Sequence, residues 1–264
     1  MTTQTAAAAI SVDDVSKTFD TPTGRVEALR NVTMEVRPGE LVCVVGPSGC
    51  GKSTMLRILA GLTEPTGGTV AFGEPNGSPA RKTMVFQDHG LFPWMSLLDN
   101  VAFALEADGV AKIERRRRAG ALLEQLGLGD FQDRFPDQLS GGMRQRATIA
   151  RALLTEPQVL LMDEPFNALD AQSKLVLQEE LMRLWETGGQ TVVYVTHDIR
   201  EAVVLGDRVF VMTGRPGTIQ LELDIELPRP RDVFERDHPE VEAKAWTIWN
   251  AIEGQVRRNL HIPS

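Results

Sequence analysis

The sequence has few cysteines, no excess of positive charge and no long apolar run, and each absence excludes a class of protein. Its only two cysteines, Cys43 and Cys50, are too few for the disulfide framework of an extracellular domain. A formal net charge of −8 argues against a nucleic-acid-binding surface, which needs a basic stripe. No apolar run approaches the roughly 20 residues that a membrane-spanning helix requires.

The first ten residues, MTTQTAAAAI, lack a basic region, and their apolar core is too short for a signal peptide. We expect residues 1–9 to form a disordered tail and the protein to be cytoplasmic. The chain has 264 residues, 42% hydrophobic and 24% charged. This length and composition suit one large α/β domain or a domain with an insertion.

The hydrophobic pattern predicts a mainly parallel central sheet joined to an antiparallel β subdomain. Apolar and polar residues alternate over residues 10–19 and 26–36, as in half-exposed antiparallel strands. Continuous apolar runs at 40–46, 158–165 and 191–197 predict buried strands. Helix-period segments follow these runs, and strands that alternate with helices imply a parallel sheet.

Helix-period segments without any β signal predict an α-helical insertion at about residues 88–140. The last of them, GDFQDRFPDQLS, runs to Ser140. We divide the chain into a domain at 10–228 and a short C-terminal helical tail at 229–264. One face of the tail is apolar, with Trp246 and Trp249 expected to pack it onto the domain; that face holds Val241, Ala245, Ile248, Trp249, Ile252 and Val256.

The stretch GPSGCGKST matches the P-loop pattern, and a predicted strand precedes it and a helix follows it. Its glycines let backbone N–H groups curl around a polyphosphate. Lys52 supplies positive charge to the β- and γ-phosphates, and the Ser53 hydroxyl can ligate Mg²⁺. The expected nucleotide-binding residues are therefore Gly46, Pro47, Ser48, Gly49, Cys50, Gly51, Lys52, Ser53 and Thr54.

Two carboxylates end the apolar strand VLLMDEP. Asp163 is placed to reach a metal at the carboxyl edge of the sheet. Glu164 points differently and is placed to accept a proton from an attacking water. The alternative for Glu164 is a capping acid before a helix, with Pro165 ending the strand.

A second phosphate-seeking motif, LSGGMRQR, has a polar cap, two glycines and a basic helical start. Together with the P-loop and the acidic strand, it closely resembles the ATP-binding-cassette (ABC) ATPases over about residues 10–215. The resemblance implies an ABC-type P-loop fold that uses ATP and Mg²⁺. It implies that Ser140, Gly141, Gly142 and Gln145 contact the nucleotide of a second cassette, identical or paired.

The same resemblance implies further roles in the site. Phe19 would stack on adenine, and His197 would hold the γ-phosphate and the water. Gln87, in the Q-loop, would touch Mg²⁺ or the water and report to a transmembrane partner. The stretch NALD, Asn167 to Asp170, matches the family's D-loop, and Asn167 stands where the family usually has serine. A plain polar cap is the alternative for His197.

The segments 87–106 and 214–232 resemble importers of nitrate, aliphatic sulfonates and taurine, and partly those of pyrimidine precursors. This implies transmembrane permease subunits that dock on the Q-loop and helical subdomain, and indirectly an extracellular solute-binding protein. Phe92 and Trp94 would line the docking groove or else belong to the core. The chain would be peripheral on the cytoplasmic face of the inner membrane.

Two other classes of function compete with an importer subunit. A soluble cassette acting in translation, DNA repair or cluster assembly usually has twin cassettes or a basic surface. A P-loop kinase or switch GTPase would leave LSGGMRQR and His197 unexplained. The run from Arg115 to Arg118 indicates a solvated helix face. We expect Cys50 to be a small loop residue whose alkylation obstructs the phosphate site.

Overall fold

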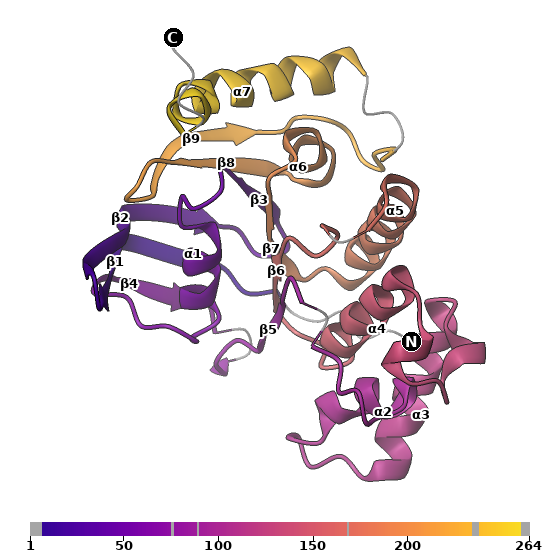
Figure 1. Cartoon of the computed structure of the whole chain (residues 1–264). Helices are drawn as coiled ribbons and strands as arrows, with labels where there is room; N and C mark the ends of the chain where they lie inside the picture. The colour runs from indigo at the N-terminus through magenta and orange to yellow at the C-terminus, as the bar shows by residue number, and fades with distance from the viewer. Residues whose placement is uncertain (1–6, 75–76, 89, 168, 234–237, 260–264) are drawn as a thin grey trace.

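The computed structural model describes residues 7–74, 77–88, 90–167, 169–233 and 238–259 (Figure 1). An antiparallel sheet of order β2-β1-β4 forms one layer. In it β1 (Ile10–Thr21) pairs with both β2 (Gly24–Val36) and β4 (Gly67–Phe72). Ile10 lies opposite Val36 and Phe72, and alternate side chains such as Ile10 and Val12 are buried.

A six-stranded sheet of order β5-β6-β7-β3-β8-β9 forms the centre of the molecule. All its pairs are parallel except β8 with β9. This arrangement confirms the predicted fold class. The strands are β3 (Leu41–Val45), β5 (Lys82–Val85), β6 (Val159–Asp163), β7 (Thr191–Thr196), β8 (Arg208–Thr213) and β9 (Thr218–Asp224).

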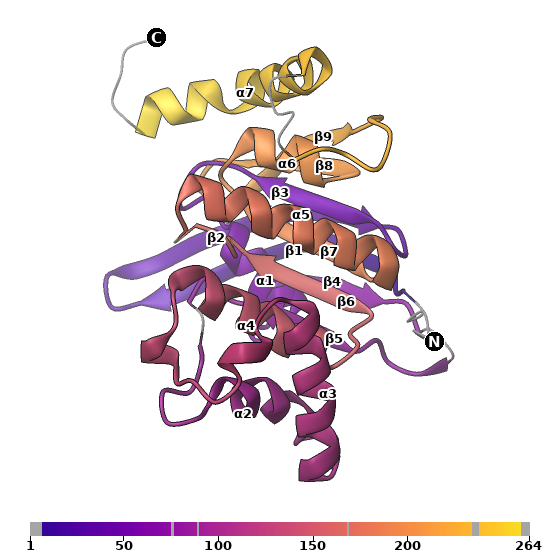
Figure 2. The same cartoon turned by 90° about the vertical axis from the view of Figure 1, so that its right-hand side faces the viewer.

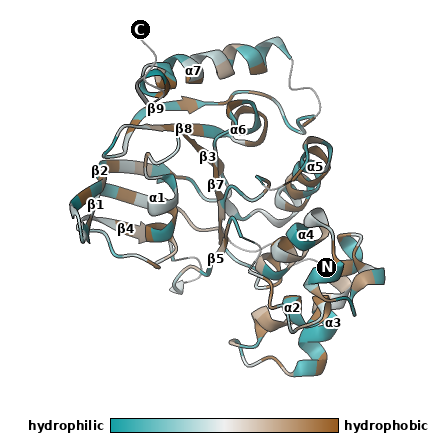
Figure 3. Ribbon diagram, viewed as in Figure 1, coloured by the Kyte–Doolittle hydropathy of each residue, from teal (hydrophilic) through white to brown (hydrophobic). Residues whose placement is uncertain are grey.

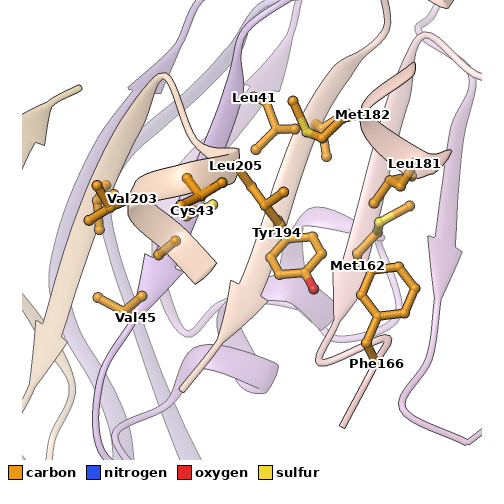
Figure 4. Close-up of a cluster of buried hydrophobic side chains, with 14 of the residues drawn as sticks. Leu41, Cys43, Val45, Met162, Phe166, Leu181, Met182, Tyr194, Val203 and Leu205 are labelled. Carbon is orange, nitrogen blue, oxygen red and sulfur yellow. The ribbon is translucent and has the colours of Figure 1, made fainter. Parts of the chain in front are cut away.

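Both faces of β3 are covered, which explains its continuous apolar sequence. Val42 and Val44 pack toward α1 (Lys52–Leu59) and the antiparallel sheet. Cys43, with Leu41 and Val45, packs on the opposite face in a cluster with Met162 and Tyr194 (Figure 4). In Figure 3 the strands at the centre of the molecule, β3 among them, are brown, because their residues are hydrophobic. The helices covering the second face are α5 (Ala171–Gly188), α6 (Ile199–Leu205) and α7 (Pro239–Asn259).

The predicted insertion forms a separate helical cluster, which lies at one end of the molecule in Figures 1 and 2. Its core combines side chains of α2 (Leu97–Ala102), α3 (Lys112–Gln125) and α4 (Gly141–Leu153). The chain reaches α4 through two 3₁₀ turns, Gly129–Phe131 and Pro136–Gln138, rather than through the expected helix. Pro136 cannot donate a helical backbone hydrogen bond, so the chain turns instead.

Two further expectations were wrong. Residues 7–9 are not a loose tail, because Ala8 is buried and its carbonyl accepts a hydrogen bond from Thr191 Oγ1 at 2.7 Å; residues 1–6 lie outside the described residues. Trp246 is 65% exposed, whereas Ile248 and Ile252 on the predicted face of α7 are buried.

Among the described residues, none of the helices combines the length and the apolarity that crossing a bilayer requires.

Candidate nucleotide site

A pocket of about 690 Å³ opens where parallel strands of the central sheet end. Because β3, β6 and β7 run in the same direction, the residues that follow them gather at one edge. The pocket brings together nine of the expected site residues: Ser48, Gly49, Gly51, Lys52, Ser53, Thr54, Gln87, Glu164 and His197.

The P-loop needs glycine at Gly46 because the backbone is crowded there. Gly46 has a positive φ of 158°, and a Cβ on it would lie 2.2 Å from the carbonyl oxygen of Met212. Lys52 is almost fully buried, and its Nζ donates to the carbonyls of Gly46 at 2.7 Å and Pro47 at 3.2 Å. The ammonium group therefore lies inside the loop, at the start of α1.

Cys50 departs from the expectation of an accessible loop thiol. Its side chain is 1% exposed and belongs to the core that α1 and the antiparallel sheet share. Burial raises the pKa of the thiol, although Lys52 opposes this. The thiol therefore points into the core, and the structure contradicts the expected accessibility of this side chain.

Ser53 and Asp163 form an oxygen pair beneath the P-loop. Ser53 Oγ donates to Asp163 Oδ1 at 3.0 Å, and Asp163 is 6% exposed. Burial raises the pKa of Asp163, while the bond from Ser53 lowers it. A buried carboxylate beside a hydroxyl fits the oxygen ligands that Mg²⁺ prefers, and Gln87 lines the same pocket. These three residues therefore fit the expected metal site.

Glu164, the expected base, contacts His197. His197 Nδ1 lies 3.1 Å from Glu164 Oε2. Glu164 has a positive φ of 45°, and its N–H donates to the carbonyl of Val195 at 3.0 Å, which fixes it against β7. It does not cap the next helix, since Asp170 is the N-cap of α5 and accepts from the N–H of Ser173 at 3.0 Å.

The signature motif, as we call the LSGGMRQR stretch from Leu139 to Arg146, lies at the start of α4 and is not part of this pocket's described lining. Ser140 is the N-cap of α4, and its Oγ accepts from the N–H of Met143 at 3.3 Å. A Cβ on Gly142 would meet no atom within 4 Å, so this helix end is open. Gln145 was expected there too, but its side chain is fully buried because it lies on the packed face of α4.

Phe19, Gly46, Pro47, Cys50, Asp163 and Asp170 are expected site residues that do not appear in the described lining. Phe19 is 38% exposed and pairs across the antiparallel sheet with Val26, which does line the pocket. Ala168, within the D-loop, lies outside the described residues.

The sequence reasoning missed five lining residues: Val26, Glu27, Ala28, Asn167 and Arg215. Asn167 was named only as a departure in the D-loop. Arg215 lies in the segment 214–232, whose sequence resembles the importer subfamily but carries no site motif. Nothing in the local sequence places the turn after β8 beside the P-loop.

The ABC transporter family matches residues 29–167 of this chain. The chain belongs to this family. It is 46% identical over 221 residues to the nitrate import ATP-binding protein NrtD of Synechocystis sp., covering 83% of each chain. It is 40% identical over 250 residues to the taurine import ATP-binding protein TauB of Roseobacter denitrificans, covering 92% of this chain and 93% of TauB.

A solved structure extends the comparison to three dimensions. The ATP-binding cassette MJ0796, a dimer in a post-hydrolysis state bound to ADP and Pi, superposes with a TM-score of 0.72 at 34% identity. The match covers 83% of this chain and all of that one. The chain is therefore an ATP-binding ATPase subunit, and the resemblance to nitrate and taurine import cassettes is confirmed.

Proposed function

We propose that this ATPase powers the uptake of a small anion, such as nitrate, a sulfonate or taurine, through transmembrane partner subunits. The names of NrtD and TauB support this substrate class. An importer of another small organic solute, such as a pyrimidine precursor, would use the same machinery. The cassette would be peripheral on the cytoplasmic face of the membrane and act with an external solute-binding protein.

In the proposed site, the P-loop amides and Lys52 hold the β- and γ-phosphates. Mg²⁺, held by Ser53, Asp163 and Gln87, would neutralise phosphate charge. Glu164 accepts the proton of the attacking water, and His197 positions Glu164 relative to the γ-phosphate. Phe19 stacks on the adenine from β1.

The open end of α4 supports a role for the signature motif in a second cassette. Ser140 and Gly142 are not in the described lining of this chain's nucleotide pocket. They lie at the N-terminus of α4, and a helix N-terminus binds anions favourably. We propose that they contact the γ-phosphate across a head-to-tail dimer, with Gly141 beside them. ATP would then join two cassettes, and hydrolysis would release them.

A second hollow, of about 310 Å³, supports docking of a permease on the helical subdomain. Trp94 is 70% exposed on its wall, and its ring centroid lies 5.4 Å from that of Phe92. A lone soluble domain rarely leaves such aromatics bare. Asp99, Glu106, Lys112 and Arg115 add charges of both signs to the lining.

Asn100 makes the loop that carries Trp94 rigid. Its buried amide accepts from the N–H of Phe92 at 2.7 Å and donates to the carbonyls of Phe92 at 3.0 Å and Met95 at 2.9 Å. Preorganised loops lose less entropy on binding. The pair Arg115 and Arg116 forms ion pairs with Glu106 and Asp99 at this rim, so the basic run is only partly a solvated face.

The observation that carries the proposal is the short stretch of chain between Gln87 and Trp94. It connects the nucleotide pocket to the hollow on the helical subdomain. Gln87 lines the nucleotide pocket and Trp94 lines the groove, so a change at the nucleotide has a short path to a docked partner. The test is to reconstitute the cassette with candidate permeases and measure which solute stimulates its ATPase activity. Stimulation by nitrate, sulfonate or taurine supports the proposal, whereas a cassette that associates with no polytopic membrane protein contradicts it.

A further inference from the structure

Arg215 lies in the turn between β8 and β9, and its side chain lines the nucleotide pocket. Its Nε donates to the carbonyl of Gly49, inside the P-loop, at 3.3 Å. A Cβ built on Gly49 would lie 2.1 Å from the guanidinium, so the two groups are in direct contact. Arg215 is therefore a cation placed on the phosphate-binding loop.

The backbone that carries Arg215 is fixed to two walls of the pocket. A Cβ on Gly217 would lie 1.9 Å from the carbonyl oxygen of Cys50, so glycine is required for this close approach. The N–H of Gly217 donates to the carbonyl of Ala28 at 2.9 Å, and its carbonyl accepts from the N–H of Arg30 at 3.0 Å. The turn is thus clamped between the P-loop and β2.

Glu27, an acidic residue in the lining of the pocket, is already paired with another arginine, so it leaves Arg215 able to bind an anion. Its carboxylate accepts two hydrogen bonds from the guanidinium of Arg30. Within the described ranges, the hydrogen bonds of Arg215 and Lys52 go to backbone carbonyls of the P-loop and not to carboxylates. The bond from Arg215 to Gly49 is long and has a neutral acceptor, so a phosphate oxygen would form a stronger one.

We propose that Arg215 is a further nucleotide-binding residue, whose guanidinium contacts the polyphosphate of ATP bound on the P-loop. A guanidinium fork matches two phosphate oxygens, and the clamped turn places it without a loop rearrangement. The inference rests on the proposed role of the P-loop and Lys52. It adds a cation supplied by the turn after β8, outside the motifs that defined the site.

The test measures the dissociation constant of MgATP by calorimetry at fixed ionic strength, on the full chain. Arg215→Ala removes the guanidinium, Arg215→Lys keeps the charge, and Arg215→Gln keeps a donor for the Gly49 carbonyl without charge. Arg117→Ala is the matched control, because Arg117 is an exposed arginine on α3 and is not in the described lining of the pocket. Lys52→Ala reports separately on the P-loop.

We expect Arg215→Ala and Arg215→Gln to weaken MgATP binding about 10- to 100-fold, the range for a hydrogen bond to a charged group. Arg215→Lys should recover part of this loss, and Arg117→Ala should bind like the wild type. Affinity within about twofold of wild type in Arg215→Ala would overturn the inference, as would full recovery by Arg215→Gln, which would assign the effect to the Gly49 bond. Unchanged binding in Lys52→Ala would instead overturn the proposed P-loop site.

Discussion

The hydroxyl of Ser53 donates a hydrogen bond to Asp163 at 3.0 Å across 110 positions of the chain. Ser53 follows β3 and Asp163 ends β6, and β7 lies between these strands in the sheet. The bond forms because all three strands are parallel and α1 packs against β6 and β7. One edge of the sheet thereby collects a hydroxyl, two carboxylates and His197.

The raised pKa of Asp163 gives a stability prediction. At a pH below the ordinary pKa of an aspartate, the Asp163 carboxyl is protonated in both the folded and the unfolded chain. As the pH rises through the raised pKa of the folded state, the carboxyl ionises, and its buried charge lowers the stability of the fold. Asp163→Asn removes that charge and should raise Tm at neutral pH by roughly 1–4 °C without nucleotide. In the wild type, MgATP should raise Tm more than ATP with a chelator does. Asp163→Asn should lose this difference.

Calorimetric scans of Asp163→Asn and wild type, with and without Mg²⁺, check both halves of this prediction. Wild type should gain more from MgATP than from ATP with EDTA. An Asp163→Asn protein that shows the same Mg²⁺-dependent gain would remove Asp163 from the metal site.

A buried polar cluster beneath His197 should be important for stability. Glu201 is 2% exposed; Tyr194 Oη donates to it at 2.6 Å, and Lys174 Nζ lies 3.1 Å from it. Lys174→Ala leaves this buried carboxylate without its cation and should lower the free energy of unfolding by about 3–5 kcal/mol. Urea denaturation measures this, with the exposed Lys112→Ala as control. A loss below about 1 kcal/mol would show that the pair is solvated.

The two exposed tryptophans separate docking from general surface effects. Trp94 and Trp246 are 70% and 65% exposed, on the helical subdomain and on α7. Trp94→Ala should weaken copurification with the permease subunits at least about tenfold, because it removes a large aromatic anchor. Trp246→Ala should not, and both should bind MgATP as the wild type does. Equal copurification of the two variants would place the interface elsewhere.

The buried thiols should be protected in the folded protein. Cys43 and Cys50 are both free and buried, and burial raises both pKa values, so the thiolate fraction at a given pH is lower than for a free cysteine. Iodoacetamide at pH 7 should modify the native chain at least about tenfold more slowly than the chain in urea. Intact-mass spectrometry follows the reaction. Rapid native modification at Cys50 would contradict the inward placement of its side chain.

The sequence was sufficient for the features that depend on local pattern and motif order. The buried runs of β3, β6 and β7, the P-loop and the two adjacent acids at the end of β6 follow from periodicity and spacing. Glu164 and His197, which the resemblance assigns to one site, lie in contact in the structure, and their roles stay predictions. Motifs at the ends of parallel strands converge by topology, so a correct sheet already implies a site.

What the sequence did not reveal depends on side-chain direction and distant packing. Helix phase around Gln145 could not be fixed from a motif, and the residue proved to be buried. A P-loop thiol can face either way, and that of Cys50 faces the core. Arg215 reaches the pocket only because the turn after β8 packs on the P-loop, a tertiary contact without a local signal.

The most direct test of the account is Glu164→Gln. Glutamine keeps the shape of the side chain but cannot accept the proton, so the ATPase rate should fall by about 10²–10⁴-fold while MgATP still binds. If the signature contacts the nucleotide of a second cassette, this variant should run as a dimer on a sizing column with MgATP and as a monomer without it. Adding Gly142→Asp should return the ATP-bound form to monomer, since a carboxylate would repel the γ-phosphate. Hydrolysis by Glu164→Gln at the wild-type rate, or tight MgATP binding by a species that stays monomeric at high concentration, would contradict it.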